Sequence, residues 1–289
     1  MSATAQTVLT WVIGALMLGV GMSLRVADFT GLLAAPRSTV VGLLAMFLMF
    51  PALAFGIVWL FPLTPASAVG LVLLAACPSS STSTLMTYLA RGDVALSLAL
   101  TAFSKLVPVV TIPVFVGLAA RLFIDEGTAL NVSIAVISGR LLQMVLLPTL
   151  AGMLLRAYFP AFTQRAQVYV TRGAVLFLVL TIVALSYRER QALPGMLLSA
   201  GPAALTLCVL GMACAHALGR LSRLSGRQRA AITLEVGMQS AGTAISLAAG
   251  VMAAPALAVP AAVYAPLMYL VAGAFVYWQR RGPGAAGAV

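Results

Sequence analysis

The sequence contains little charge and few reactive side chains. Only 8% of its 289 residues are charged, lysine and histidine occur once each, and there are three cysteines. Cys77, Cys208 and Cys214 all fall within apolar segments and form neither a metal-ligand spacing nor a disulfide framework, so we expect small buried packing residues. With 62% hydrophobic residues, this composition excludes a soluble domain of this size and predicts a polytopic membrane protein.

Several functional classes are disfavoured by what is missing. The first apolar segment lacks a basic leader and an Ala-x-Ala site, so a cleavable signal peptide is not expected. The net charge of +11 comes from arginines at the ends of apolar segments, where they can act as orientation signals and contact lipid head groups. We therefore expect no nucleic-acid partner. We find no nucleophile–base pair or metal-ligand spacing, which argues against an enzyme, and we expect no cofactor.

Apolar stretches long enough to cross a bilayer, which takes about 20 residues, recur along the whole chain. We expect nine spans, at residues 8–22, 39–61, 66–90, 94–124, 132–158, 168–186, 196–218, 230–254 and 256–278. Arginines gather in alternate loops, for example at Arg91, Arg223 and Arg280. The positive-inside rule therefore places the N-terminus outside the cell and the C-terminus in the cytoplasm.

The third span is interrupted by polar residues. Pro78 is followed by six consecutive hydroxyl residues, Ser79 to Thr84. A proline removes a backbone donor, and non-helical backbone survives at membrane depth only where it lines protein or a cavity. We therefore expect a discontinuous helix near 79–84. The alternative is a continuous helix whose hydroxyls bond to neighbouring helices.

The eighth span carries Glu235 and Gln239 one turn apart, followed by Ser240 and Thr243. The glycines at 237 and 242 permit a break, which we expect near 239–242. An ionised side chain at membrane depth is costly and is by default a functional hypothesis. Carboxylate and amide oxygens are hard donors that suit an alkali cation. The alternative is that Glu235 pairs with a structural cation.

The fourth span contains that candidate cation. Lys105, the only lysine, follows Ser97 and Thr101 on one helical face, about 15 Å from either end of the span. Because an uncompensated ammonium at that depth would lose its proton, the sequence predicts that Lys105 pairs with Glu235. The alternative is that Lys105 points toward another group of helices and only attracts an anionic substrate.

Two other ionisable residues lie within apolar segments. Arg140, one turn from Gln143 in the fifth span, offers a fork to a substrate carboxylate or makes a structural contact. We expect His216, near the end of the seventh span, to be an interfacial residue rather than a proton relay.

The two interrupted spans are the third and the eighth, which cross the bilayer in opposite directions. Pairing the first four spans with the last four leaves the fifth unpaired, as if a duplicated five-helix unit had lost its first helix. Inverted repeats of this kind place a substrate site near the midplane. The expected fold class is an all-α polytopic membrane protein. Its nine transmembrane helices form an inverted five-helix repeat lacking its first helix, with two discontinuous helices.

Three segments carry a resemblance to a known family: Cys77-Pro78, residues 86–97 and the Glu-Val-Gly-Met-Gln run at 235–239. The chain resembles the bile acid:sodium symporter family, in its bacterial branch, over almost its whole length. The resemblance implies one transmembrane unit, 1–289, in a bacterial inner membrane. It divides that unit into a core domain, 39–124 and 196–279, and a panel domain, 8–24 and 132–187, and it implies that the two discontinuous helices cross in the core.

The resemblance also implies two sodium sites and a substrate site. The first ion site would use Ser83, Ser97, Thr101 and Glu235, with Thr84 in place of the family's asparagine. The second would use Glu235, Val236, Met238 and Gln239, with Met46 in place of the family's glutamine. The candidate substrate residues are Ser81, Thr82, Ser240, Thr243 and Arg140.

The interpretation that follows is a secondary transporter of a small organic anion, such as a bile-acid-like, pantoate-like or pyruvate-like carboxylate, that works by alternating access. Both ion sites are altered, so we expect transport without sodium, with Lys105 replacing the ion. The alternatives are sodium symport through a remaining site at Glu235 and Gln239, and a membrane receptor that binds a ligand without moving it. The expected partners are the organic anion and the lipid bilayer, and no oligomeric state is assigned.

Overall fold

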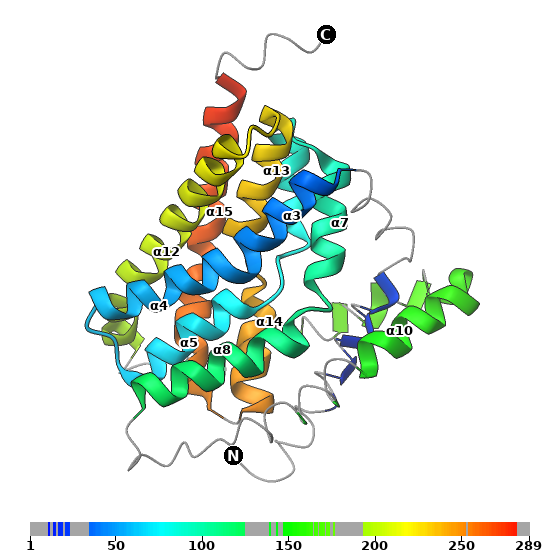
Figure 1. The fold of residues 1–289 in the computed structure, drawn as a ribbon. Helices are drawn as coiled ribbons and strands as arrows, with labels where there is room; N and C mark the ends of the chain where they lie inside the picture. The colour runs from blue at the N-terminus through cyan, green and yellow to red at the C-terminus, as the bar shows by residue number, and fades with distance from the viewer. Residues whose placement is uncertain are drawn as a thin grey trace.

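The computed structural model describes residues 35–124, 147–163, 193–252 and 254–281, together with 11, 14–15, 17–19, 21–23, 139, 143, 165–166, 168–170, 172–173 and 176. These residues form an all-helical bundle (Figure 1). Its elements are α3 (Pro36–Leu44), η2 (Ala45–Met49), α4 (Phe50–Leu60), α5 (Pro65–Ala76), α6 (Thr82–Leu89), α7 (Val94–Ser104), α8 (Pro108–Phe123), α10 (Leu147–Tyr158), α12 (Leu193–Leu221), α13 (Gly226–Gly237), α14 (Ala241–Ser246), η4 (Leu247–Val251), η5 (Pro255–Ala258) and α15 (Val259–Arg281).

Three helical runs of the described residues are long and apolar enough to cross a bilayer. They are Pro36–Leu60, Leu198–Leu221 and Pro255–Arg281, and they coincide with the expected spans 39–61, 196–218 and 256–278. The first contains the π-helical turn η2 between α3 and α4. The structure describes only parts of the expected spans 8–22, 132–158 and 168–186.

The remaining expected spans are each built from shorter helices. The third, 66–90, is divided into α5 and α6, and the eighth, 230–254, into α13, α14 and η4. Every residue of α5 from Ser67 onward and of α13 from Ala230 onward is buried. A helix that is enclosed on all sides belongs to the interior of a bundle. The two interrupted spans therefore lie in the interior, where their free backbone groups can find protein partners.

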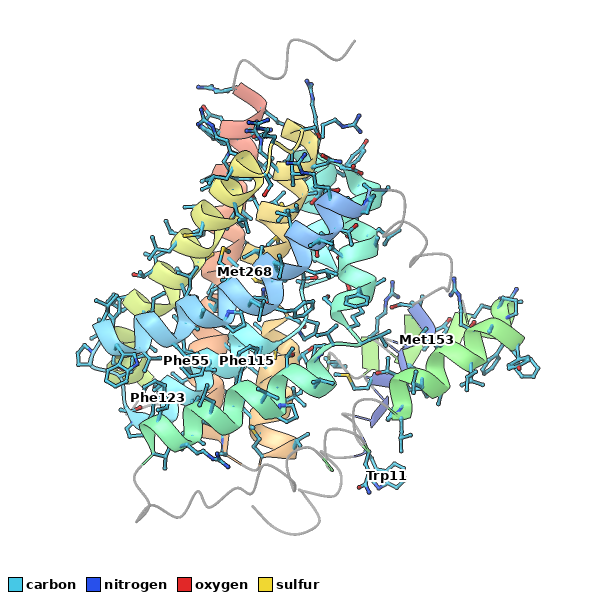
Figure 2. The ribbon with its side chains drawn as sticks, in the orientation of Figure 1. Trp11, Phe55, Phe115, Phe123, Met153 and Met268 are labelled. Atoms are coloured by element: carbon cyan, nitrogen blue, oxygen red, sulfur yellow. The ribbon has the colours of Figure 1, made fainter. Side chains whose placement is uncertain are left out.

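The fourth span differs from the prediction, because it is not one helix. α7 ends at Ser104, a turn follows at Lys105–Val107, and α8 begins at Pro108. In this turn Lys105 N donates to the Ala102 oxygen and Leu106 N to the Phe103 oxygen, three residues earlier in the chain. Pro108 has no N–H, so it cannot continue the helical series of main-chain hydrogen bonds. α8 then packs against α5 and α4, where Phe55 lies between Phe115 and Phe123 with centroid distances of 6.4 and 6.0 Å (Figure 2).

α10 packs against the N-terminal helical residues, to the right of the bundle in Figure 1. A Cβ at Gly152 would lie 2.3 Å from the Leu18 carbonyl oxygen, and one at Gly21 would lie 2.0 Å from the Thr149 oxygen. Only glycine fits at these two positions, because the opposing groups are main chain. Arg156 Nη1 adds a hydrogen bond of 3.2 Å to the Met22 carbonyl oxygen.

A candidate ion and substrate site at the helix crossing

The two interrupted spans cross, and their breaks are joined by main-chain hydrogen bonds. Ser79 and Gln239 form an isolated antiparallel bridge. Ser80 N donates to the Met238 oxygen at 2.7 Å, and Ser240 N donates to the Pro78 oxygen at 2.8 Å. The expected breaks are therefore present. They lie at 77–81 and 238–240, so both helices resume earlier than the sequence predicted.

Side-chain hydroxyls satisfy two further backbone carbonyls next to the breaks. The Gly237 carbonyl at the end of α13 accepts a hydrogen bond of 2.8 Å from the hydroxyl of Tyr264, which is fully buried. The Ala76 carbonyl at the end of α5 accepts one of 3.3 Å from Thr111. Buried backbone groups without partners are costly at membrane depth. These two hydroxyls therefore make the interruptions tolerable.

We expect Tyr264→Phe to destabilise the protein without removing a site residue. The variant keeps the buried ring and leaves the Gly237 carbonyl without its hydroxyl donor, which costs about 1–3 kcal/mol. The melting temperature in detergent should fall by several degrees. Tyr277→Phe is the matched control, since Tyr277 is 57% exposed and Arg281 contacts its ring face. Equal melting temperatures for the two variants would contradict this role.

Glu235 lies at the centre of a cluster of oxygen atoms. Its side chain is fully buried in the last turn of α13. Ser83 Oγ and Ser97 Oγ each donate to its Oε1 atom at 2.5 Å, and Thr101 Oγ1 lies 2.9 Å from both carboxylate oxygens. Thr84 Oγ1 completes the cluster, 3.2 Å from Ser97 Oγ and 3.4 Å from Thr101 Oγ1. The five residues predicted for the first ion site thus come together from α6, α7 and α13.

Lys105 is not part of this cluster, which corrects the predicted pairing with Glu235. Its Nζ donates instead to Ser23 Oγ at 3.5 Å. The predicted face of Ser97, Thr101 and Lys105 required a continuous helix, but α7 ends at Ser104 and the lysine side chain leaves in another direction. Among the described residues no cationic side chain bonds to Glu235, whose hydrogen bonds come from hydroxyls.

The residues predicted for the second ion site lie at the crossing itself. Gln239 is 1% exposed, and its Nε2 donates to the Val236 oxygen at 2.9 Å. Its Oε1 is buried and has no hydrogen-bond partner in the described part of the chain. The Met238 oxygen is already used by Ser80 N. Met46 is buried in η2, which packs against α13.

The predicted substrate residues lie on a less buried side of the crossing. Thr82 Oγ1 lies 2.8 Å from Ser80 Oγ and 3.2 Å from the hydroxyl of Tyr269. Ser240 Oγ and Thr243 Oγ1 form a second pair, 2.8 Å apart. Ser81 is exposed. Arg140 lies outside the described residues.

The sequence reasoning missed three residues of this region. Tyr264 and Tyr269 reach the crossing from α15, and no spacing in the sequence relates them to it. Ser104 follows Thr101 by three residues, so the helical period offered a signal that it shares that side of α7. It receives a hydrogen bond of 3.2 Å from Ser79 N.

His216 lies in α12 among aromatic rings. Its ring centroid is 5.8 Å from that of Phe275 and 5.5 Å from that of Trp278, and its Nδ1 lies 3.5 Å from Thr233 Oγ1. These contacts place it against α13 and near the end of α15, and none of them is with a residue of the Glu235 cluster.

The chain is similar to known transport proteins. The model of the Sodium Bile acid symporter family matches residues 10–194. An uncharacterized sodium-dependent transporter, YocS, of Bacillus subtilis is 28% identical over 94% of this chain and 83% of its own length. A probable chloroplastic sodium/metabolite cotransporter of Oryza sativa, BASS2, is 32% identical over 93% of this chain and 63% of its own length.

A mammalian relative extends the similarity. The ileal sodium/bile acid cotransporter of Cricetulus griseus is 24% identical over 63% of this chain and 51% of its own length. The family match, the apolar helices and these relatives lead to one conclusion: the chain belongs to the Sodium Bile acid symporter family and is a multi-pass membrane transporter rather than an enzyme.

Proposed function

We propose that the chain is a sodium-coupled secondary transporter of a small organic anion. The observation that carries the proposal is the buried Glu235 carboxylate, surrounded by hydroxyls at the crossing of two interrupted helices. An ionised group at this depth needs a compensating charge. Lys105 bonds to Ser23 instead, so a cation from solution is the better candidate for the charge that compensates Glu235. We therefore propose sodium symport in place of the expected sodium-independent transport.

The residues present suit sodium as a co-transported substrate. Glu235, Ser83, Thr84, Ser97 and Thr101 supply only hard oxygen atoms. The hydroxyls of Ser83, Ser97 and Thr101 donate to the carboxylate, and every hydroxyl oxygen of the cluster has lone pairs that can turn to a cation. Thr84 keeps a hydroxyl oxygen where the family has an asparagine. At the second site, Gln239 supplies a buried oxygen that no described residue uses.

The arrangement also supports coupling between ion and substrate. An ion held by the Glu235 cluster would tie together α6, which begins at the crossing, α13, which ends there, and α7. The hydroxyls of Thr82, Tyr269, Ser240 and Thr243 lie just beyond the main-chain bonds of the same crossing. Ion binding can therefore order the backbone that presents the substrate groups, which is what symport by alternating access requires.

The anion preference rests on cationic groups outside the ion cluster. Lys105 extends from the α7–α8 turn toward Ser23, away from Glu235, where it can attract a carboxylate. Arg140 remains a proposal for the same role. The relatives' names give sodium/metabolite and sodium/bile acid cotransport, so a small metabolite carboxylate or a bile acid is the substrate class we propose.

The proposed architecture is the nine-helix form with an inverted repeat and with core and panel domains, in a bacterial inner membrane. Its support is the interruption of the third and the eighth spans and the separate packing of α10 with the N-terminal residues. We propose that the N-terminus lies outside and the C-terminus in the cytoplasm, because arginines concentrate at one end of the bundle.

Replacing sodium by choline tests the proposal directly. In proteoliposomes that take up a radiolabelled carboxylate, uptake should fall at least tenfold in choline, because the ammonium group of choline is too large for the hydroxyl cluster. Lys105→Gln should keep this sodium dependence and raise the KM for the carboxylate. If uptake instead persists in choline and is lost in Lys105→Gln, sodium coupling is wrong and the lysine is the coupling cation.

A further inference from the structure

Seven arginines gather at one end of the bundle. They lie where α6, α12 and α15 end and α13 begins, at the top of Figure 2, and all but Arg229 are exposed. We call this set the arginine patch: Arg91, Arg220, Arg223, Arg227, Arg229, Arg280 and Arg281. Hydrogen bonds hold its parts together, since Arg280 Nε donates to the Leu89 oxygen at 2.7 Å and Asp93 N donates to the Arg227 oxygen at 3.0 Å.

Two members of the arginine patch occupy a backbone conformation that suits glycine. Arg91 has a φ of 54° and Arg223 a φ of 53°, and these are the described non-glycine residues with positive φ. Each ends a helix in the same way: Gly92 N bonds to the Thr87 oxygen, and Leu224 N to the Gly219 oxygen, over five residues. Helices that end like this usually place glycine at the left-handed position. An arginine at both positions makes the fold less stable than glycine would, so we expect the arginine side chains to have a function.

The charge of the arginine patch is hardly compensated by the protein. Among the described residues the acidic side chains are Asp93 and Glu235, and Glu235 is buried in the ion cluster. Asp93 caps α7 by accepting a hydrogen bond from Leu96 N. The end of α8 near Phe123, at the lower left of Figure 2, carries Arg121. Seven of the twelve described arginines therefore belong to the arginine patch, and Arg37, Arg121, Arg156, Arg165 and Arg172 lie outside it.

We propose that the arginine patch docks on the anionic phospholipid head groups of the membrane that the helices cross. The charge is complementary, and guanidinium groups bind phosphate oxygens in pairs. The patch lies at the ends of two membrane-spanning runs, Leu198–Leu221 and Pro255–Arg281, which is the depth of the head groups. Trp278 lies three residues from Arg281 and is 57% exposed, as expected for an interfacial tryptophan.

Trp278 provides a reporter for the test. With Trp11 and Trp59 replaced by phenylalanine, it is the only tryptophan of the chain. We expect brominated phosphatidylglycerol, diluted into phosphatidylcholine vesicles that hold the full-length transporter, to quench Trp278 more than brominated phosphatidylcholine does. In Arg91→Gly/Arg223→Gly the phosphatidylglycerol fraction needed for half-quenching should rise about 25-fold, or about fivefold per arginine.

The glycine substitutions separate lipid binding from folding. Because glycine adopts positive φ without strain, the double variant should melt at or above the wild-type temperature, so lost quenching cannot reflect unfolding. Arg91→Lys/Arg223→Lys should retain most of the quenching, and Arg121→Gly all of it. Equal quenching by both lipids in the wild type, or wild-type quenching in the glycine variant, would overturn the proposal. Displacement of the lipid by soluble glycerol phosphate at constant ionic strength would assign the patch to a soluble anion and also overturn it.

Discussion

Glu235→Gln is expected to abolish sodium-dependent uptake while leaving the protein folded. The amide has nearly the same shape, and the hydroxyls of Ser83, Ser97 and Thr101 can turn to serve its oxygen and its NH2 group. The negative charge that compensates a bound cation is lost. Removing one partner of a buried charge pair costs about 3–5 kcal/mol, which corresponds to a loss of sodium affinity of roughly 100-fold or more.

Two measurements check this result together. Uptake into proteoliposomes should lose its sodium dependence, and sodium should no longer raise the melting temperature, because a ligand stabilises only the state that binds it. Thr87→Val is the matched control. Thr87 lies one turn beyond Ser83 on α6, is fully buried, and its Oγ1 has no partner among the described residues. A sodium response that survives Glu235→Gln, or that is lost in Thr87→Val, would remove the hydroxyl cluster as the ion site.

The interruptions of the third and eighth spans were predictable because their signals are local. A proline followed by hydroxyl residues, or a carboxylate, an amide and glycines within an apolar run, disfavours a continuous transmembrane helix wherever it occurs. The structure places both breaks within a few residues of the expected positions. The convergence of Ser83, Thr84, Ser97, Thr101 and Glu235 rested on the family resemblance, since no spacing in one chain relates α6 to α13.

The error at Lys105 has an equally physical origin. Residues four apart share a face only within one continuous helix. α7 ends at Ser104, just before the turn that leads to Pro108, so Lys105 no longer shares the face of Ser97 and Thr101. The expected span 94–124 places Pro108 inside a helix, whereas Pro108 begins α8, and proline is favoured in the first turn of a helix. Tyr264 and Tyr269 were missed for another reason. Their roles depend on how α15 packs against the crossing, which no local pattern encodes.

Gln239→Leu is expected to weaken sodium binding strongly while changing the sodium-free protein little. The buried Oε1 of Gln239 lacks a partner, so removing it relieves a cost of about 1–3 kcal/mol. The substitution also removes the Nε2 bond to the Val236 oxygen, which costs a similar amount. These two effects offset each other, and leucine fills nearly the same volume. The melting temperature in choline should therefore stay within a few degrees of wild type.

In sodium the two proteins should differ clearly. If Gln239 Oε1 is an ion ligand, the sodium concentration that gives half of the maximal melting shift should rise at least tenfold in Gln239→Leu, a loss of about 1.4 kcal/mol of binding free energy. Gln279→Leu, a partly exposed glutamine near the end of α15, serves as the control and should respond to sodium as the wild type does. A large loss of stability in choline with an unchanged half-maximal sodium concentration would show that Gln239 only supports the main chain at the crossing.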